Sequence, residues 1–199
     1  MKWFRRKKKN CSASVEGFPT LATERLVLRQ FDPGDAVDVF VYAQSPAVGP
    51  MAGWPPHRSI EESRAIVQHF VSCGDVWAIV EKKTGRVIGS IGLHADGKRE
   101  VEGARMLGYV LGEAHWGQGY ATEAAQAALR FAFEQKQCRV VSAYHFPNNS
   151  RSKRVIKKLG FAAEGTLRMA STLPDGTVTD EVCYSLTREE YLARAAKQG

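Results

Sequence analysis

The sequence predicts an α/β protein in which helices cover both faces of a β-sheet. Two observations lead to this fold class. Short runs rich in Val, Ile and Leu, typical of strands, alternate with longer stretches whose apolar residues recur every three or four positions, typical of helices. In chain order the elements are a strand, two helices, three strands, a helix, a strand, a helix, two strands and a last helix. A chain of 199 residues with 44% hydrophobic content is also long enough to bury a sizeable core.

Local signals bound the predicted elements. The run Asp32–Asp35 is a turn that also caps the first helix, and Ser59 with Glu62 gives a capping-box pattern before the second. The segments 84–86 and 174–176 are turns within hairpins. Strands are expected over 26–29, 76–81, 87–93, 104–111, 140–144, 165–172 and 178–186, and helices over 36–44, 60–72, 121–136, 150–159 and 188–197.

A run of basic residues near the N-terminus predicts that the chain divides into a basic tail, residues 1–18, and a single domain, residues 19–199. The net charge of the chain is +7, and residues 2–9 alone carry six positive charges. Such a tail is either a solvated, disordered extension or a segment that contacts RNA, the ribosome or an anionic lipid surface. Without the tail the domain is close to neutral, so a nucleic-acid-binding protein is not the favoured class.

Other compositional features point to a cytoplasmic protein. No run of 18 apolar residues predicts a membrane span, and no apolar stretch follows the charged N-terminus as it would in a secretory signal. The four cysteines, Cys11, Cys73, Cys138 and Cys183, are scattered without metal-type pairs. We therefore expect a reduced environment and no metal site.

The most informative motif is HWGQGYATEA, residues 115–124, a glycine-broken turn that opens into an alanine-rich helix. Gly117 and Gly119 allow the backbone to adopt left-handed angles and to approach a ligand closely. The helix that follows starts with unpaired amide N–H groups and the positive end of its dipole. These features suit phosphate oxygens, although an isolated G-x-G also occurs at ordinary loop-to-helix junctions. A dinucleotide-binding motif fits less well because the third glycine is missing.

A second motif, N-S-R-S-K-R-V-I-K-K-L-G-F over 149–161, favours the ligand-binding turn over an ordinary loop-to-helix junction. Placed after W-G-Q-G-Y-A-T-E-A and an intervening strand, it resembles the acetyl-CoA-binding core of the GNAT superfamily of N-acetyltransferases. The motifs G-Y-V-L, W-G-Q-G-Y-A-T-E-A, N-x-x-S and K-L-G-F are most similar to those of the ribosomal-protein N-terminal acetyltransferase branch. The resemblance covers roughly residues 19–188 and implies a mixed, mostly antiparallel sheet that splays between its fourth and fifth strands.

The resemblance implies acetyl-CoA as co-substrate and a set of residues that bind it. The diphosphate would lie on the backbone amides of the glycine turn, and the pantetheine arm would pair with the strand that ends in G-Y-V-L, like an added strand. Relatives usually carry Arg or Gln where this chain has Trp116, so phosphate binding here would depend more on the backbone. The expected cofactor-binding residues are Val110, Leu111, Trp116, Gly117, Gln118, Gly119, Tyr120, Ala121, Thr122, Asn149 and Ser152.

Acyl transfer to an amine requires a neutral amine, a polarised thioester carbonyl and a stabilised leaving thiolate. Many GNAT enzymes place a tyrosine acid where this chain has Ile156, so we expect Ser152 to act as hydroxyl donor, with a helix-start or cofactor-contact role as the alternative. Some relatives carry a Glu near the position of Ser171, and that Glu would act as their base. This chain has Ser171 instead, so that base is in doubt here. The remaining candidates for the base are Glu102 and His57, and either is also consistent with an ordinary surface-loop residue.

The acceptor is expected to bind against Trp54, His57 and Tyr144, together with the closing hairpin. An aromatic wall suits a peptide N-terminus, a polyamine, an aminosugar or a drug amine. The sequence has no dense acidic cluster of the kind that would bind a polycationic acceptor. This absence favours a protein or peptide N-terminal α-amine, such as that of a ribosomal protein. The alternatives are acetylation of a small-molecule amine and a non-catalytic acetyl-CoA-binding module. Either a monomer or a homodimer is compatible with the sequence.

Overall fold

A mixed β-sheet organises residues 17–197, which are the residues that this computed structural model describes. The tail predicted over 1–18 lies almost entirely outside them. The strands are β1 (Leu21–Ala22), β2 (Leu26–Arg29), β3 (Val76–Glu81), β4 (Val87–Ala95), β5 (Ala104–Leu111), β6 (Val140–His145), β7 (Ala162–Thr172) and β8 (Val178–Thr187). The helices are α2 (Ala36–Ala43), α3 (Ile60–Cys73), α4 (Tyr120–Arg130), α5 (Ser150–Lys158) and α6 (Arg188–Ala195).

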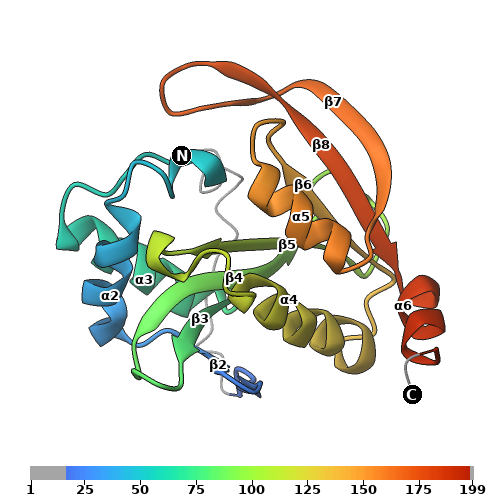
Figure 1. Ribbon diagram of the computed structural model, residues 1–199, viewed down its shortest axis with the longest axis horizontal. Coiled ribbons are helices and arrows are strands. Elements are labelled where there is room, and N and C mark those ends of the chain that lie inside the picture. The colour runs from blue at the N-terminus through green and yellow to red at the C-terminus, as the bar shows by residue number, and fades with distance from the viewer. Residues whose placement is uncertain (1–16, 198–199) are drawn as a thin grey trace.

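The strand order across the sheet is β1-β2-β3-β4-β5-β6-β8-β7. Every neighbouring pair is antiparallel except β5 and β6, which run parallel. Helices cover both faces of the sheet, with α2 and α3 on one side and α4 on the other (Figure 1). This architecture confirms the predicted fold class.

Helix α4 lies close to the sheet because small residues form its buried face. Ala124, Ala125 and Ala128 are fully buried in the larger apolar cluster, which also contains Trp77 and Ile79 of β3. Small side chains keep the helix axis near the strands, and this proximity fixes the position of the helix N-terminus relative to the sheet. The opposite face of β3, with Val76 and Val80, packs with α2 and α3 in the second cluster.

The predicted helix caps form only in part. Asp32 and Asp35 form a reciprocal capping box around the short 3₁₀ turn Pro33–Asp35, whereas α2 itself starts without a side-chain cap. At α3 only half of the predicted box is present, because Ser59 Oγ accepts from the Glu62 amide at 3.4 Å while the Glu62 carboxylate accepts from the amide of Arg58 at 2.8 Å. The loop between α2 and α3 is thereby tied to the start of α3.

The outer edge of the sheet is irregular. Strand β7 departs from regular pairing with β8 between Ala163 and Gly165 and again between Leu167 and Ser171. Within the second irregularity Met169 has a φ of 52°, in the left-handed region, and its amide donates to Asp180 Oδ1 at 2.8 Å. A bulge of this kind bends and twists an edge strand.

Two features differ from the sequence-based expectation. The sequence pattern does not predict β1, which pairs with β2 through only two residues. The long helix expected over 121–136 is α-helical to Arg130 and continues as a π-helical turn, Phe131–Gln135. Within residues 17–197, no helix has both the length and the apolar content needed to cross a membrane.

Candidate active site

Strands β5 and β6 separate after a short parallel contact. They pair over only three positions, Ala104 to Met106 with Val140 to Ser142. Beyond this point β5 continues beside β4 as far as Leu111, whereas β6 continues beside β8 as far as His145. We call the region beyond these three pairs the splay. It is the separation predicted between the fourth and fifth strands of the sequence-based scheme.

The splay leaves backbone groups of β5 without a strand partner on that side. The Gly112 amide donates to the Ile88 carbonyl at 2.9 Å, so the alternation of an antiparallel ladder turns the groups of Val110 toward β4. The same alternation turns the N–H and C=O of Tyr109 and Leu111 toward the splay. The Leu111 carbonyl accepts from the indole N–H of Trp116 at 2.9 Å. The edge of β5 at Tyr109 and Leu111 is therefore where an extended amide-bearing chain could pair.

The turn before α4 has the backbone geometry that the glycines predict. Gly117 and Gly119 have φ values of 76° and 86°, and Gly119 is the N-cap of α4. No side chain among the described residues caps this end of the helix. A Cβ at Gly117 would meet nothing within 4 Å, so the turn is open on that side. Successive amides in such a turn, at the positive end of a helix, form a concave site for anionic oxygens.

A buttress holds this turn from behind. Arg25, just before β2, donates to the Gln118 carbonyl at 2.9 Å and pairs with Glu123 of α4 at 2.7 Å. The Glu123 carboxylate also accepts from Thr23 Oγ1 at 2.6 Å. Burial alone would raise the pKa of Glu123, but the hydrogen bonds from Thr23 and Arg25 outweigh burial and lower it. Glu123 is thus an ionised structural group of the helix start, and its carboxylate is not available as a base.

Ser152 and Asn149 lie at the start of α5. Asn149 caps the helix, because its Oδ1 accepts from the Ser152 amide at 3.0 Å, and its Nδ2 donates to the Met51 carbonyl at 3.2 Å. The Ser152 hydroxyl lies 2.9 Å from the hydroxyl of Tyr109. Burial raises the pKa of Tyr109 to about 12, although the contact with Ser152 lowers it, so the phenol stays protonated near neutral pH. Ile156 is fully buried in the core.

The loop of residues 45–57 lies beside α5. Besides the Met51–Asn149 bond, Gly53 lies against Phe146, since a Cβ at Gly53 would be 3.5 Å from that ring. The rings of Trp54 and His57 pack at a centroid distance of 5.3 Å. His57 Nδ1 lies 2.8 Å from the Oγ of the fully buried Ser63. Burial lowers the pKa of His57 below its ordinary value, against the opposing charge of Glu62, so the imidazole is neutral at pH 7.

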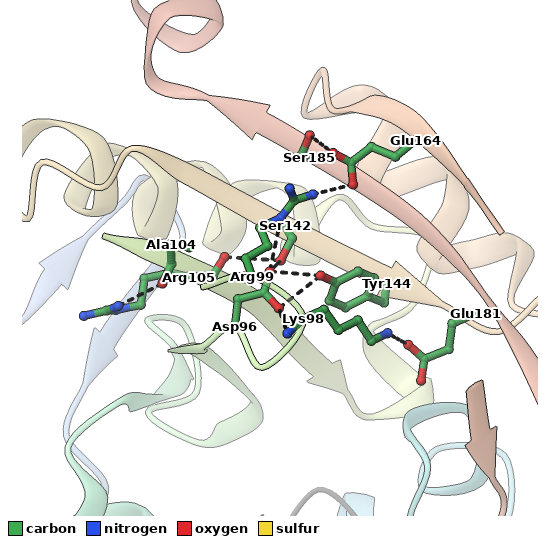
Figure 2. A network of polar contacts seen from close by, with 10 residues as sticks. All are labelled: Asp96, Lys98, Arg99, Ala104, Arg105, Ser142, Tyr144, Glu164, Glu181 and Ser185. Atoms are coloured by element: carbon green, nitrogen blue, oxygen red, sulfur yellow. Dashed lines mark hydrogen bonds and ion pairs between the residues drawn. The ribbon is translucent and has the colours of Figure 1, made fainter. Parts of the chain in front are cut away.

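Tyr144 faces a different set of partners. Its hydroxyl donates to the buried carboxylate of Asp96 at 2.9 Å, and Lys98 Nζ lies 3.8 Å from its ring centroid (Figure 2). Asp96 also accepts from Ser142 Oγ at 2.5 Å. The loop between β4 and β5 thus covers this part of β6, and its residues Asp96 and Lys98 hold the side chain of Tyr144. Tyr144 is not seen in contact with Trp54 or His57.

Two ion pairs extend this network to the closing hairpin. Lys98 pairs with Glu181 of β8, and Arg99 pairs with Glu164 of β7 (Figure 2). Ser171 donates to the same Glu181 carboxylate. The carboxylate that the sequence lacks at Ser171 is therefore present beside it, on the neighbouring strand, but it is neutralised by Lys98.

Glu102 lies exposed just before β5, at the end of the strand where β5 and β6 are joined. At about 3.3 Å per residue, Ala104 and Leu111 are roughly 23 Å apart along β5. The structure does not bring Glu102 to the splay. Ser152, by contrast, bonds Tyr109 of the splayed part of β5, and the loop that carries His57 bonds α5.

Comparison with known proteins identifies the family. Residues 25–162 match the model of the acetyltransferase (GNAT) domain. The chain belongs to the GNAT family. It is an acetyl-CoA-dependent N-acetyltransferase, which transfers an acetyl group to an amine.

Its relatives agree with this assignment. The uncharacterized N-acetyltransferase YoaA of Bacillus subtilis is 31% identical over 176 residues, which cover 86% of this chain and 98% of that protein. A GNAT-family acetyltransferase from Bacillus anthracis has a structure with a TM-score of 0.79 and 25% identity, covering 86% of this chain and 100% of the other. The [ribosomal protein uS5]-alanine N-acetyltransferase of Escherichia coli is 33% identical over 85 residues, 43% of each chain.

The residues present fit the co-substrate of a GNAT enzyme. The uncapped α4 start and the open side of Gly117 suit the diphosphate of acetyl-CoA, and the edge of β5 at Tyr109 and Leu111, which lacks a strand partner, suits an amide arm. Sequence reasoning named the strand and the turn but missed the side chain of Tyr109. The G-Y-V-L run contains Tyr109 and was the one local signal for it. The run does not reveal the partner of Tyr109, because Ser152 lies 43 positions further along the chain.

Proposed function

We propose that this N-acetyltransferase acetylates the α-amine at a protein N-terminus, with His57 as the base that accepts the ammonium proton. The observation that carries the proposal is the neutral, half-buried imidazole of His57. It is held against Trp54 in the loop that bonds the start of α5. That bond joins the loop that carries His57 to the start of the helix that carries Ser152.

Ser63 fixes the orientation of the His57 ring. Its Oγ lies within hydrogen-bond distance of Nδ1 and can accept from or donate to that nitrogen, and in the tautomer that carries the proton on Nδ1 the lone pair is on Nε2. The amide of His57 donates to the Ala43 carbonyl at 3.0 Å, which fixes the backbone at the end of the loop. A neutral imidazole held in this way can take a proton directly or through one water.

The lowered pKa of His57 favours a weakly basic acceptor. An α-ammonium group has a pKa of about 8, whereas a lysine or other alkylammonium group has a pKa of about 10.4. Moving a proton from the alkylammonium to the same base costs roughly 3 kcal/mol more, at ~1.36 kcal/mol per pKa unit. A base whose pKa lies below that of an ordinary histidine is therefore better matched to an α-amine.

The Tyr109–Ser152 pair is suited to the leaving group. Acetyl-CoA supplies the acetyl thioester, and the departing thiolate needs a hydrogen-bond donor. Tyr109 keeps its proton, since burial raises its pKa to about 12, and it can donate to Ser152 Oγ. The Ser152 O–H is then free to donate into the splay. In this arrangement Ser152 contacts the sulfur and Tyr109 orients the serine hydroxyl.

The relative that acts on a ribosomal protein supports a protein acceptor. The Escherichia coli [ribosomal protein uS5]-alanine N-acetyltransferase shares 33% identity with this chain over 85 residues. Its match covers less than half of either chain, so the support concerns the general acceptor class and leaves the particular N-terminus open.

The test is thiol release from acetyl-CoA against a matched panel of amines. It compares Ala- and Ser-starting peptides with the same peptides blocked at the N-terminus but carrying a lysine, and with polyamines and aminoglycosides. Release with free N-termini, lost on blocking, is the expected result. Release only with polyamines or aminoglycosides would replace the protein acceptor with a small-molecule amine. Binding of acetyl-CoA without turnover of any amine would favour a non-catalytic module.

A further inference from the structure

An arginine from α5 lies on the aromatic ring that precedes the glycine turn. The guanidinium carbon of Arg151 is 3.9 Å from the ring centroid of Trp116. The ring is fixed, because its indole N–H donates to the Leu111 carbonyl and the side chain packs against both apolar clusters. Trp116 therefore acts as a platform that holds a cation from a helix 35 positions further along the chain.

The charge of Arg151 is not neutralised by any carboxylate of the described residues. Among residues 17–197, no carboxylate lies within ion-pair distance of its guanidinium. The other arginine at this turn, Arg25, is paired with Glu123 and bonded to the Gln118 carbonyl. Arg151 is thus the arginine at the glycine turn that retains an unpaired positive charge, within the part of the chain that the structure describes.

The position of this charge matches the chemistry of the turn. Gly117 follows Trp116 directly, and the turn presents amides and an open side to a ligand. An anion bound there would lie beside the stacked guanidinium, and an arginine can donate two parallel hydrogen bonds to phosphate oxygens. Trp116 itself carries no charge, and the cation beside it is the guanidinium that Arg151 brings from α5.

We infer that Arg151, held on the face of Trp116, binds the diphosphate of acetyl-CoA. This inference rests on the enzyme's use of acetyl-CoA and is independent of the identity of the amine. Arg151 supplies from α5 the positive charge that the residue before Gly117 does not provide. Trp116 is a positioning residue, because it acts on the ligand through the arginine.

The test measures equilibrium binding by calorimetry, without turnover. CoA and dephospho-CoA, which lacks the 3′-phosphate but keeps the diphosphate, are titrated into the full chain and into Arg151→Gln. Affinity for both ligands is expected to fall about tenfold, as for loss of one partly exposed charge-assisted hydrogen bond. The salt dependence of binding should also weaken. Lys153→Gln, two residues further on and about 200° around the same helix, is the charge-matched control and should leave both affinities unchanged.

A second variant separates stacking from simple charge. Trp116→Leu should weaken binding of both ligands, and adding Arg151→Gln in that background should cost little more, because the two side chains act together. Full additivity of the two changes would overturn the platform role. Unchanged affinity in Arg151→Gln would overturn the inference while leaving the acetyl-CoA site in place. Loss confined to CoA would place the contact at the 3′-phosphate and overturn the diphosphate assignment. Failure of the unmodified chain to bind CoA would overturn the cofactor site and this inference together.

Discussion

The hydroxyl oxygens of Tyr109 and Ser152 lie 2.9 Å apart and join β5 to α5 beyond the point where β5 and β6 stop pairing. One residue comes from the strand edge and the other from the first turn of the helix that follows β6. Position 156 on α5, where the family resemblance implies a tyrosine, is a fully buried isoleucine. A phenol on β5 and a serine on α5 thus provide the hydroxyl groups near the splay.

Removing either hydroxyl tests this pair. Tyr109→Phe and Ser152→Ala should each lower kcat by about 100-fold, the lower end of the scale for one lost catalytic donor, with a smaller effect on KM for acetyl-CoA. Steady-state thiol release gives both constants. Tyr184→Phe is the matched control, because it removes another buried phenol hydroxyl, whose partner is His145. A loss in Tyr184→Phe equal to that in Tyr109→Phe would contradict a specific role.

The pH dependence of kcat/KM should report His57. Burial lowers its pKa, so the neutral, proton-accepting form persists as the pH falls below 6.5, and the acidic limb of the profile should lie below that value. Glu62 opposes this shift, so Glu62→Gln should lower the pKa further and move the limb to still lower pH. His57→Gln should abolish the limb. A limb that stays in place in His57→Gln would assign the titration to another group.

The glycine turn can be tested against a turn with the same backbone strain. Gly117 and Gly85 have φ values of 76° and 67°, and a Cβ at either would meet nothing within 4 Å. Alanine at each should therefore cost a similar ~1–2 kcal/mol of stability, measured by urea unfolding. Only Gly117→Ala should also weaken CoA binding, because Gly85 lies in the β3–β4 hairpin. Equal CoA affinities in the two variants would remove the turn from the binding site.

The Asp96 network should contribute to stability. Asp96 is almost fully buried and accepts from Ser142 and Tyr144. Asp96→Asn places amide hydrogens opposite those donors and should lower the free energy of unfolding by about 1–3 kcal/mol. Chemical denaturation measures this loss. Asp175→Asn, at the exposed turn of the β7–β8 hairpin, is the control and should change stability much less. An equal loss in both variants would contradict the importance of the buried network.

The sequence predicts most of the elements because their signals are local. Strand β5 and the start of α3 are found from runs of apolar residues and from caps such as Ser59, which accepts from the amide three positions away. The glycine turn is found because Gly117 needs a left-handed backbone that other residues disfavour. The short strand β1 escapes detection because two residues form no period.

The missing parts of the site depend on contacts between distant segments. Tyr109 bonds a residue 43 positions away, and Arg151 stacks on Trp116, 35 positions earlier. Nothing local to a tyrosine in G-Y-V-L or an arginine on a basic helix specifies these partners. Tyr144 shows the converse. It is an aromatic residue on a strand next to the splay, but a buried aspartate from the β4–β5 loop holds its hydroxyl.

The irregular outer strand has a consequence for the behaviour of the protein at high concentration. A long, flat strand at the border of a sheet is a template on which another chain can add its own strand, and such growth leads to aggregation. Strand β7 has 11 residues, but its ladder is interrupted twice and Met169 turns the backbone into the left-handed region. At the opposite border, β1 offers only two residues. Neither border strand is a good template for the addition of strands from other chains. The irregular β7 and the short β1 therefore disfavour aggregation through the sheet edges.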